Sequence, residues 1–376
     1  MRVLKTLLAL LLVSLCSHEV VAEETILALP FENTSQNAEY NWIGEGFTLT
    51  LLNLLSESGV VVIDRDERNL AYEKVGLQPS VLVTRATALK IADKAGADLL
   101  ITGTYRIEGT AGAQLISVTA RIINVREMMT IGSDLNFAGS ISKLQWIQGQ
   151  LAWEVLHKVN PNHPISRDQM VNRSTSVPLS AFESYTKALL TSNREDKVRF
   201  LFKAISEYQK ESVGQYTQAI FKLGQLNYGE KNYRDAFNWF DKIPQNEPQY
   251  LEARFYACVC LLHVSEPATE TMKRLSQLLP LYEVYNNAAI AELRHGDINE
   301  AVRLLGLAVQ GQPNDSDILF NYGYALWKTG QYPAAANQLN KLVRSHPKDG
   351  QAFYLLAKSL EKMEQKPEAA AALDEA

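Results

Sequence analysis

Histidine, serine, cysteine and acidic side chains are the groups in this chain that could carry out catalysis or hold a metal ion. The histidines after residue 22 are scattered, and none belongs to a His-Glu-x-x-His zinc motif. No serine stands in the Gly-x-Ser-x-Gly context that marks many hydrolase nucleophiles. We therefore expect no catalytic residue, no metal ion and no cofactor, with an unrecognised hydrolase as the remaining enzymatic alternative. These histidines are His157, His163, His263, His295 and His346.

Two glycines near the start of a predicted helix, Gly44 and Gly46, could expose backbone N–H groups to a phosphate. The chain has neither a Gly-x-x-x-x-Gly-Lys loop nor a Gly-x-Gly-x-x-Gly fingerprint. We therefore expect these glycines to cap and pack the helix.

An acidic cluster, Asp64, Asp66 and Glu67, follows a predicted strand and could in principle bind a divalent cation. Arg65 and Arg68 alternate with these carboxylates and would repel the cation. We therefore expect a solvated turn here.

Cys258 and Cys260 are separated by one residue in an apolar stretch with helical character. Residues i and i+2 of a helix do not face each other. The spacing therefore predicts two packed thiols, and neither a disulfide nor a metal site.

The C-terminal half contains a repeat. Ala301, Ala335 and Ala369 recur every 34 residues, and Pro313 and Pro347 keep the same interval. A small residue at this position lets the two helices of a repeat cross closely, and the proline ends the second helix. The period and pattern predict helix–turn–helix units of the tetratricopeptide type, which bind other proteins.

We predict five full units and one incomplete unit within residues 179–376, which together form an all-α solenoid. One of the five is three residues short, and the first is atypical. The predicted units are residues 180–212, 217–250, 251–281, 282–315, 316–349 and 350–376.

Stacked units present their first helices on a concave face, and side chains not used for packing point into it. Aromatic residues beside polar ones suit a bound peptide or helix. The alternative is that these aromatics pack against the next unit. Repeats of this family that bind chaperones hold a C-terminal carboxylate with asparagines and lysines, and matching lysines are absent here. The predicted partner-binding residues are Phe221, Tyr228, Asn286, Ile290, Phe320, Tyr324, Trp327, Tyr354 and Lys358.

Residues 23–160 alternate between strand and helix patterns. The order predicts an α/β sandwich that combines parallel pairing with an antiparallel meander, in which Gly109 and Gly112 make a hairpin. Strands are predicted at residues 26–31, 60–63, 99–107, 114–125 and 130–137, and helices at 43–55, 82–97 and 141–159.

Several motifs in this part resemble the amino-terminal domain of TolB and its relatives. They run in order over most of residues 25–158: LALPFEN at 27–33, IGEGFT at 43–48, VVIDR at 61–65, ADKAGADLLITG at 92–103 and VTARIIN at 118–124. Related domains occur in curli-secretion and flagellar outer-membrane accessory proteins. The resemblance implies a non-enzymatic module for assembly or sensing in the bacterial envelope. No β-propeller follows, so the chain departs from complete TolB.

The first 22 residues have the features of a signal peptide. Arg2 and Lys5 precede an apolar run at residues 7–15, and Ala22 gives a small-residue cleavage site before Glu23. We expect cleavage after Ala22 and a periplasmic or secreted protein, with an uncleaved anchor as the alternative. No later apolar run approaches membrane-spanning length.

Residues 161–178 are polar and contain three prolines, which predicts a semi-stiff linker between the two domains.

The net charge of −5 gives no basic surface that would attract nucleic acid. We predict a protein-binding adaptor or scaffold of the cell envelope. The alternative is an accessory component of an outer-membrane secretion or assembly machine, with the N-terminal domain forming an oligomer.

Overall fold

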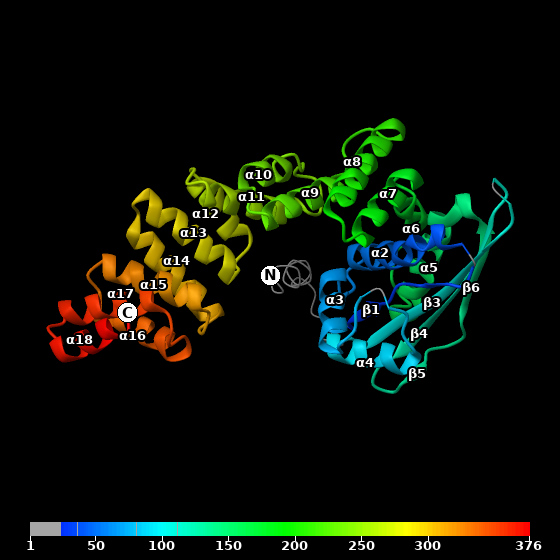
Figure 1. The fold of residues 1–376 in the computed structure, drawn as a ribbon. Coiled ribbons are helices and arrows are strands. Elements are labelled where there is room, and N and C mark those ends of the chain that lie inside the picture. The colour runs from blue at the N-terminus through cyan, green and yellow to red at the C-terminus, as the bar shows by residue number, and fades with distance from the viewer. Residues whose placement is uncertain (1–23, 36, 80, 111) are drawn as a thin grey trace. The chain divides into compact units, whose positions relative to one another are not determined.

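The computed structural model of the protein describes residues 24–376 except 36, 80 and 111. The predicted signal peptide, residues 1–22, lies outside the described residues. Contacts divide the described chain into two compact units, residues 24–219 and residues 220–376 (Figure 1). The predicted boundary at 161–178 does not coincide with this division. Each unit is described separately below.

The first unit is built on a mixed six-stranded sheet. β1 and β2 pair with β3 in parallel, whereas β4 is antiparallel to β3, β5 and β6. This arrangement confirms the predicted combination of parallel pairing and a meander. The strands are β1 (Ile26–Ala28), β2 (Glu32–Asn33), β3 (Leu99–Glu108), β4 (Leu115–Asn124), β5 (Met129–Thr130) and β6 (Leu135–Ser140).

Helices cover both faces of this sheet because side chains alternate along its strands. Ile26 and Ile101 belong to a core with α2 and α5, and Leu27 and Leu100 belong to a core with α3 and α4 (Figure 1). The helices of the unit are α2 (Trp42–Glu57), α3 (Arg65–Lys74), α4 (Arg85–Ala95), α5 (Leu144–Val159), α6 (Arg167–Ser174), α7 (Leu179–Leu190) and α8 (Arg194–Glu211), with short 3-10 turns η1 (Ala38–Tyr40) and η2 (Ile141–Lys143).

The predicted strand at residues 60–63 is reduced to a single isolated β-bridge, which joins Ile26 and Val62 in parallel. The Ile26 N–H donates to Val61 O at 2.9 Å, and the Ile63 N–H donates to Ile26 O at 2.9 Å. The chain therefore follows the edge of β1 without forming a full strand.

The acidic cluster is not a solvated turn, as the sequence suggested, but the start of helix α3. Asp64 caps α3 by accepting a hydrogen bond from the Glu67 N–H at 2.9 Å. Arg68, one turn further along, is 2% exposed. Its Nη2 donates to both carboxylate oxygens of Glu45, at 2.7 and 2.9 Å. The arginines are therefore structural partners of a buried carboxylate on α2.

Arg65 completes this ion-pair cluster. Its Nε lies 2.9 Å from Glu45 Oε1, and its Nη2 donates to the backbone oxygen of Leu189 at 2.8 Å. One carboxylate on α2 thus binds two arginines of α3, and one of these arginines also binds the last turn of α7.

The glycines beside Glu45 allow close packing, as predicted. A Cβ at Gly44 would lie 2.1 Å from Phe31 O, and one at Gly46 would lie 3.1 Å from a ring carbon of Phe182. The Phe31 N–H also donates to Gly44 O at 3.2 Å. These positions favour glycine because another chain segment already fills the space.

The predicted linker contains helix α6, which packs on α5. Ser166 and Gln169 form a capping box at its start, and Met170 is fully buried. A Cβ at Gly149 in α5 would lie 2.8 Å from Val171 Cα, which shows how closely the two helices approach. Residues 161–178 are therefore not a free connector. The sequence concealed this because α6 is short and buries few side chains.

The first predicted repeat, α7 and α8, forms the expected helix pair but packs on the first unit. The ring of Phe182 in α7 lies edge to face against Trp42 of α2, with the ring centroids 6.2 Å apart, and it belongs to the core that covers the sheet.

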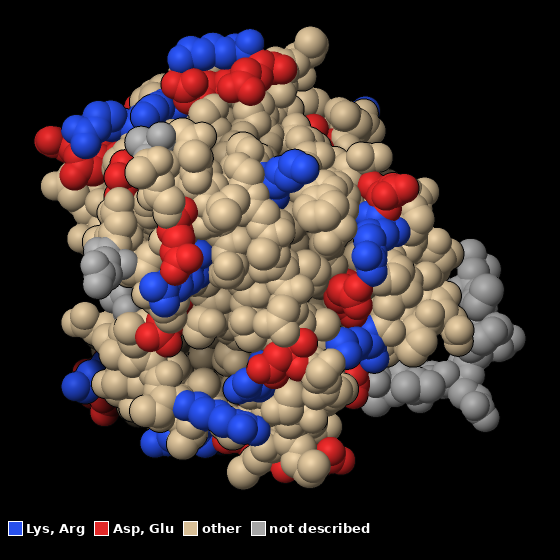
Figure 2. Space-filling model, turned by 90° about the vertical axis from the view of Figure 1, so that its right-hand side faces the viewer, with Lys and Arg blue, Asp and Glu red and all other residues tan. Residues whose placement is uncertain are grey.

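On the face of the molecule drawn in Figure 2, acidic and basic side chains are interspersed.

The second unit is an array of helix pairs that begin within one residue of the predicted repeats. The array confirms the predicted solenoid of tetratricopeptide-like pairs. Its helices are α9 (Thr217–Gly229), α10 (Tyr233–Phe240), α11 (Tyr250–His263), α12 (Thr269–Leu278), α13 (Tyr282–His295), α14 (Ile298–Gly311), α15 (Ser316–Lys328), α16 (Tyr332–Ser345), α17 (Gly350–Lys362) and α18 (Lys366–Asp374).

Small residues occupy the helix crossings within the pairs. A Cβ at Gly224 would lie 2.6 Å from the Phe240 ring, and one at Gly323 would lie 2.7 Å from Leu339 Cγ. The repeating alanines of the second helices are buried as well. The close approach of the two helices therefore requires small residues on both sides of the crossing.

Among the described helices, none is both long and apolar enough to cross a membrane.

We predict that Glu45→Gln destabilises the protein by about 3–5 kcal/mol, because it leaves the buried Arg68 guanidinium without a counter-charge. Urea unfolding followed by circular dichroism measures this loss. The control is Glu154→Gln, whose partner Arg167 is 45% exposed and whose loss should cost less than about 1 kcal/mol. Equal losses in the two variants would contradict the structural role of the buried pair.

We also predict that Gly323→Ala lowers stability by about 1–3 kcal/mol, since the new methyl group would overpack the crossing with α16. Gly306→Ala is the matched control on α14, because its Cβ would meet only the end of the Tyr322 side chain, with the hydroxyl oxygen at 3.5 Å and Cζ at 4.0 Å. Alanine is the better helix former by about 1 kcal/mol, so this control should be neutral or stabilising. Scanning calorimetry of the two variants gives the comparison, and a neutral Gly323→Ala would refute the packing constraint.

Candidate partner-binding groove

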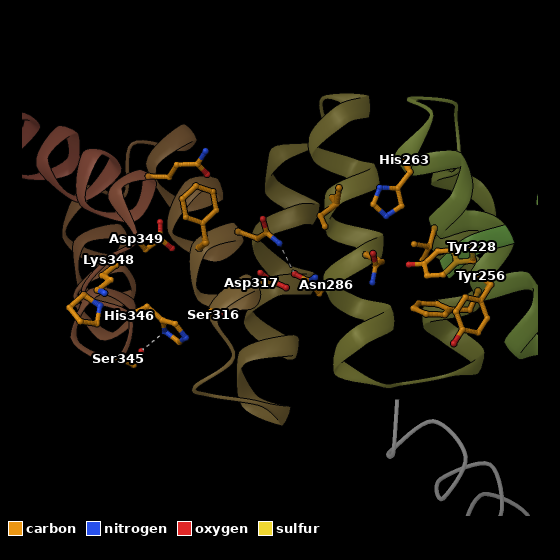
Figure 3. Close-up of a pocket in the computed structure, with 18 residues that line it drawn as sticks. Tyr228, Tyr256, His263, Asn286, Ser316, Asp317, Ser345, His346, Lys348 and Asp349 are labelled. Carbon is orange, nitrogen blue, oxygen red and sulfur yellow. Dashed lines mark hydrogen bonds between the residues drawn. The ribbon is translucent and has the colours of Figure 1, made fainter. Parts of the chain in front are cut away.

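Two adjoining pockets lie along the first helices of the pairs in the second unit. The first, here called the polar pocket, measures about 960 Å³ and is formed by α9, α11, α13, α15, the α16–α17 loop and the start of α17 (Figure 3). The second, here called the aromatic pocket, measures about 950 Å³ and is formed by α15, α17 and α18. Phe320 and Gln351 line both pockets, so the two form one continuous groove.

Asparagine amides supply hydrogen-bonding groups to the polar pocket. The Asn321 Nδ2 donates to Asn286 Oδ1 at 3.0 Å, and the two side chains come from neighbouring helices (Figure 3). Each amide has two donor hydrogens and two acceptor lone pairs, so this bond leaves capacity for a ligand main chain. Asn287 instead donates to Glu283 O of its own helix at 2.8 Å.

Charged and titratable groups cluster where α16 meets α17. Asp349 accepts from the Ala352 N–H at 3.0 Å and so caps α17. His346 Nδ1 lies 3.0 Å from Ser345 Oγ, and Lys348 lines the pocket beside them. Asp317 contributes a second carboxylate from α15. This pocket therefore carries both signs of charge.

Aromatic rings close the other end of the polar pocket. His263 stacks on Tyr233 with ring centroids 4.0 Å apart. Burial, and then the charge of Arg294, lower the pKa of His263, so this ring is neutral at pH 7. Burial also raises the pKa of Tyr228, which keeps its hydroxyl protonated. This end of the groove thus presents neutral rings to a ligand.

The aromatic pocket is lined mainly by rings. Phe320, Tyr324 and Trp327 come from α15, and Tyr354 comes from α17. The Trp327 Nε1 is buried and has no hydrogen-bond partner. Lys358 lines this pocket too, and its Nζ lies 2.8 Å from Glu361 Oε2, which raises the pKa of the lysine.

The structure places eight of the nine predicted residues along the groove. Phe320 lines both pockets; Tyr228, Asn286 and Ile290 line the polar pocket, and Tyr324, Trp327, Tyr354 and Lys358 line the aromatic pocket.

Phe221 lines neither pocket. It is 9% exposed, and its ring lies edge to face against Phe240 and Tyr256, at 5.4 and 6.0 Å. In this part of the array, a ring on the first helix packs against its neighbours, which was the alternative considered for all the aromatics.

Sequence reasoning missed the groove residues of α11 and of the α16–α17 loop. Tyr256, Val259 and His263 line the polar pocket from α11, and His346 and Lys348 line it from the loop. The α11–α12 unit is short, so repeat positions could not be transferred to it. The loop residues lie outside the repeating helix pattern altogether.

Cys258 and Cys260 are packed, buried thiols on α11, as predicted. Burial raises the pKa of each thiol to about 12, so both stay protonated. In the described part of the chain, no group of three or more His, Cys, Asp or Glu side chains could hold a metal ion.

Comparison with known proteins identifies the repeat type. Residues 292–359 match the family model of the tetratricopeptide repeat. This span contains parts of α13 and α17 and all of α14, α15 and α16. This span is therefore similar to tetratricopeptide repeats. The same comparisons do not identify residues 24–219.

Solved structures that match part of the chain are distant from it in sequence. "Crystal structure of MamA protein" is 17% identical, with a TM-score of 0.39, and the match covers 42% of this chain and 88% of that one. "Crystal structure of YrrB: a TPR protein with an unusual peptide-binding site" is also 17% identical, with a TM-score of 0.40 and coverage of 46% and 89%. No curated protein matches the chain.

We predict that Phe221→Ala destabilises the protein by about 3–5 kcal/mol because it empties a packed site. Tyr354→Ala is the matched groove variant, since this ring is 52% exposed and its truncation should change stability by about 0.5 kcal/mol or less. Thermal unfolding of both variants distinguishes core from groove. A large loss for Tyr354→Ala would show that its ring is needed for packing.

Proposed function

We propose that the protein is a non-enzymatic adaptor or scaffold whose groove binds a polypeptide segment. The observation that carries this proposal is the continuity of the groove. Five successive first helices, α9, α11, α13, α15 and α17, contribute side chains to two pockets that share Phe320 and Gln351. A surface of this length fits a chain segment better than a small molecule.

The side chains of the groove suit such a ligand. Partly exposed aromatic rings give a large contact area at a small loss of conformational entropy. The Asn286–Asn321 pair places amide donors and acceptors where a main chain would lie. Rings therefore supply affinity in this proposal, and amides supply orientation.

The proposed location is the bacterial cell envelope. Two sequence features support it, namely the signal-peptide pattern of residues 1–22 and the resemblance of residues 25–158 to the TolB amino-terminal domain. The α/β domain would then contact an envelope component while the groove holds the partner segment.

An open sheet edge favours one alternative function, an accessory role in an outer-membrane secretion or assembly machine. Among the described strands, β6 pairs only with β4. A free edge can pair with a strand from another copy, which would allow the α/β domain to form oligomers. Chemical cross-linking of the purified protein separates the two functions, because a ring of defined size supports the machine component.

Site-specific photo-crosslinking in cells tests the proposed binding. A photoreactive amino acid at position 354 should form an adduct with a protein partner, and the adduct should appear in the periplasmic fraction. The control is the same amino acid at position 278, because Leu278 is 60% exposed and lies outside both pockets. Equal adducts at the two positions would contradict groove binding. An adduct confined to the cytoplasmic fraction would contradict only the location.

A further inference from the structure

The aromatic pocket has hydrogen-bond donors that are not matched by acceptors. The Trp327 Nε1 is buried without a partner, although an indole N–H is only a donor. Burial of an unsatisfied donor costs free energy, so an acceptor that reached it would gain more than at an exposed site.

Lys358 lines this pocket, and Lys328 contacts the ring of Tyr324, which also lines it. Lys328 Nζ lies 5.5 Å from the ring centroid of Tyr324, and Lys358 Nζ lies 5.6 Å from that of Tyr354. Each lysine follows its tyrosine by one helical turn, so each ammonium group lies against a ring that lines the pocket. Lys358 also binds Glu361, but that carboxylate is 45% exposed, and such surface pairs contribute little to stability.

No aspartate or glutamate is among the described residues that line the aromatic pocket. The polar pocket, in contrast, includes Asp317 and Asp349. The two ends of the groove therefore differ in charge, and a carboxylate on a ligand would meet less repulsion at the aromatic end.

We propose that the aromatic pocket binds a partner segment in which an aromatic or aliphatic side chain stands next to an acidic one. The apolar side chain packs on Phe320, Tyr324 and Tyr354. The carboxylate lies beside Lys358 and is attracted also by the ammonium group of Lys328, and an acceptor oxygen of the segment takes the Trp327 N–H. This inference rests on the proposed peptide binding and names the partner chemistry for one half of the groove.

Three short peptides of equal length test the inference with the purified full chain. All are acetylated and amidated; one alternates Phe and Asp, the second replaces Asp with Asn, and the third replaces Phe with Ser. Titration calorimetry should show that the Phe–Asp peptide binds at least about tenfold more tightly than either of the others. Its affinity should fall between about 0.1 M and about 1 M salt, because the screening length shortens from about 10 Å to about 3 Å.

Substitutions in the chain test whether the peptide binds in the aromatic pocket. Lys328→Gln with Lys358→Gln should weaken the Phe–Asp peptide about tenfold and leave the Phe–Asn peptide unchanged. The matched control, Lys341→Gln with Lys366→Gln, removes the same charge from exposed positions outside both pockets and should have no effect. Trp327→Phe keeps a ring but removes the indole N–H, so it should weaken both Phe-containing peptides.

Three results would overturn the inference. They are equal binding of the Phe–Asp and Phe–Asn peptides, no binding of the Phe–Asp peptide, and equal losses in the two lysine variants. A Phe–Asp peptide that binds only with a free C-terminus would also overturn it, since a terminal carboxylate would then be the ligand. The crosslink at position 354 does not depend on these outcomes and tests peptide binding separately.

Discussion

The close approach of two helices inside each repeat is the constraint on which the second unit depends. At Gly323 there is no room for a Cβ against Leu339, and Gly224 faces the ring of Phe240 in the same way. Because each second helix lies so close to its first helix, the first helices can stand side by side along the array. Their outward side chains then form one continuous surface, which is the groove. Residues that never touch a ligand thus determine where the ligand-binding side chains lie.

The first unit depends on a different kind of constraint, a buried charge. Glu45 is 2% exposed and is stable in that position only because Arg65 and Arg68 neutralise it. Both arginines belong to α3, so the ion pairs fix α3 against α2. Arg65 also binds the Leu189 carbonyl, so the last turn of α7 is positioned by the same cluster. Packing in the repeats needs shape, whereas packing here needs matched charge.

The sequence predicted the repeats well because their period is local. The alanine spacing alone places the starts of the helix pairs, since each crossing needs a small residue at a fixed distance from the last. Most groove residues followed from the same register. Phe221 did not, because its burial depends on Phe240 and on Tyr256 of the next pair.

Features that depend on distant partners could not be predicted in this way. Helix α3 looked like a solvated turn because the partner of Arg68 lies 23 residues earlier in the chain. A pattern at Arg68, Ala71 and Tyr72 does mark one buried face of a helix, and it was the available signal. Helix α6 has a similar buried face at Met170, Val171 and Ser174, but its close contact with α5 also requires Gly149 on the other helix.

The place of α7 also bears on how such a gene could be divided or fused. A break within residues 161–178 would place α2 and α7 on different chains. Trp42 and Phe182 would then each lose the ring that it packs against. The stretch between α8 and α9 is different, because Val213 is fully exposed and Gly214 has a φ of 108°. Recombination at Val213 or Gly214 would separate Tyr216 from the rings of Tyr185 and Tyr208, but it would leave the contact between Trp42 and Phe182 intact. We infer that exchange of binding arrays among related genes is least disruptive there, with the first helix pair inherited together with the sheet.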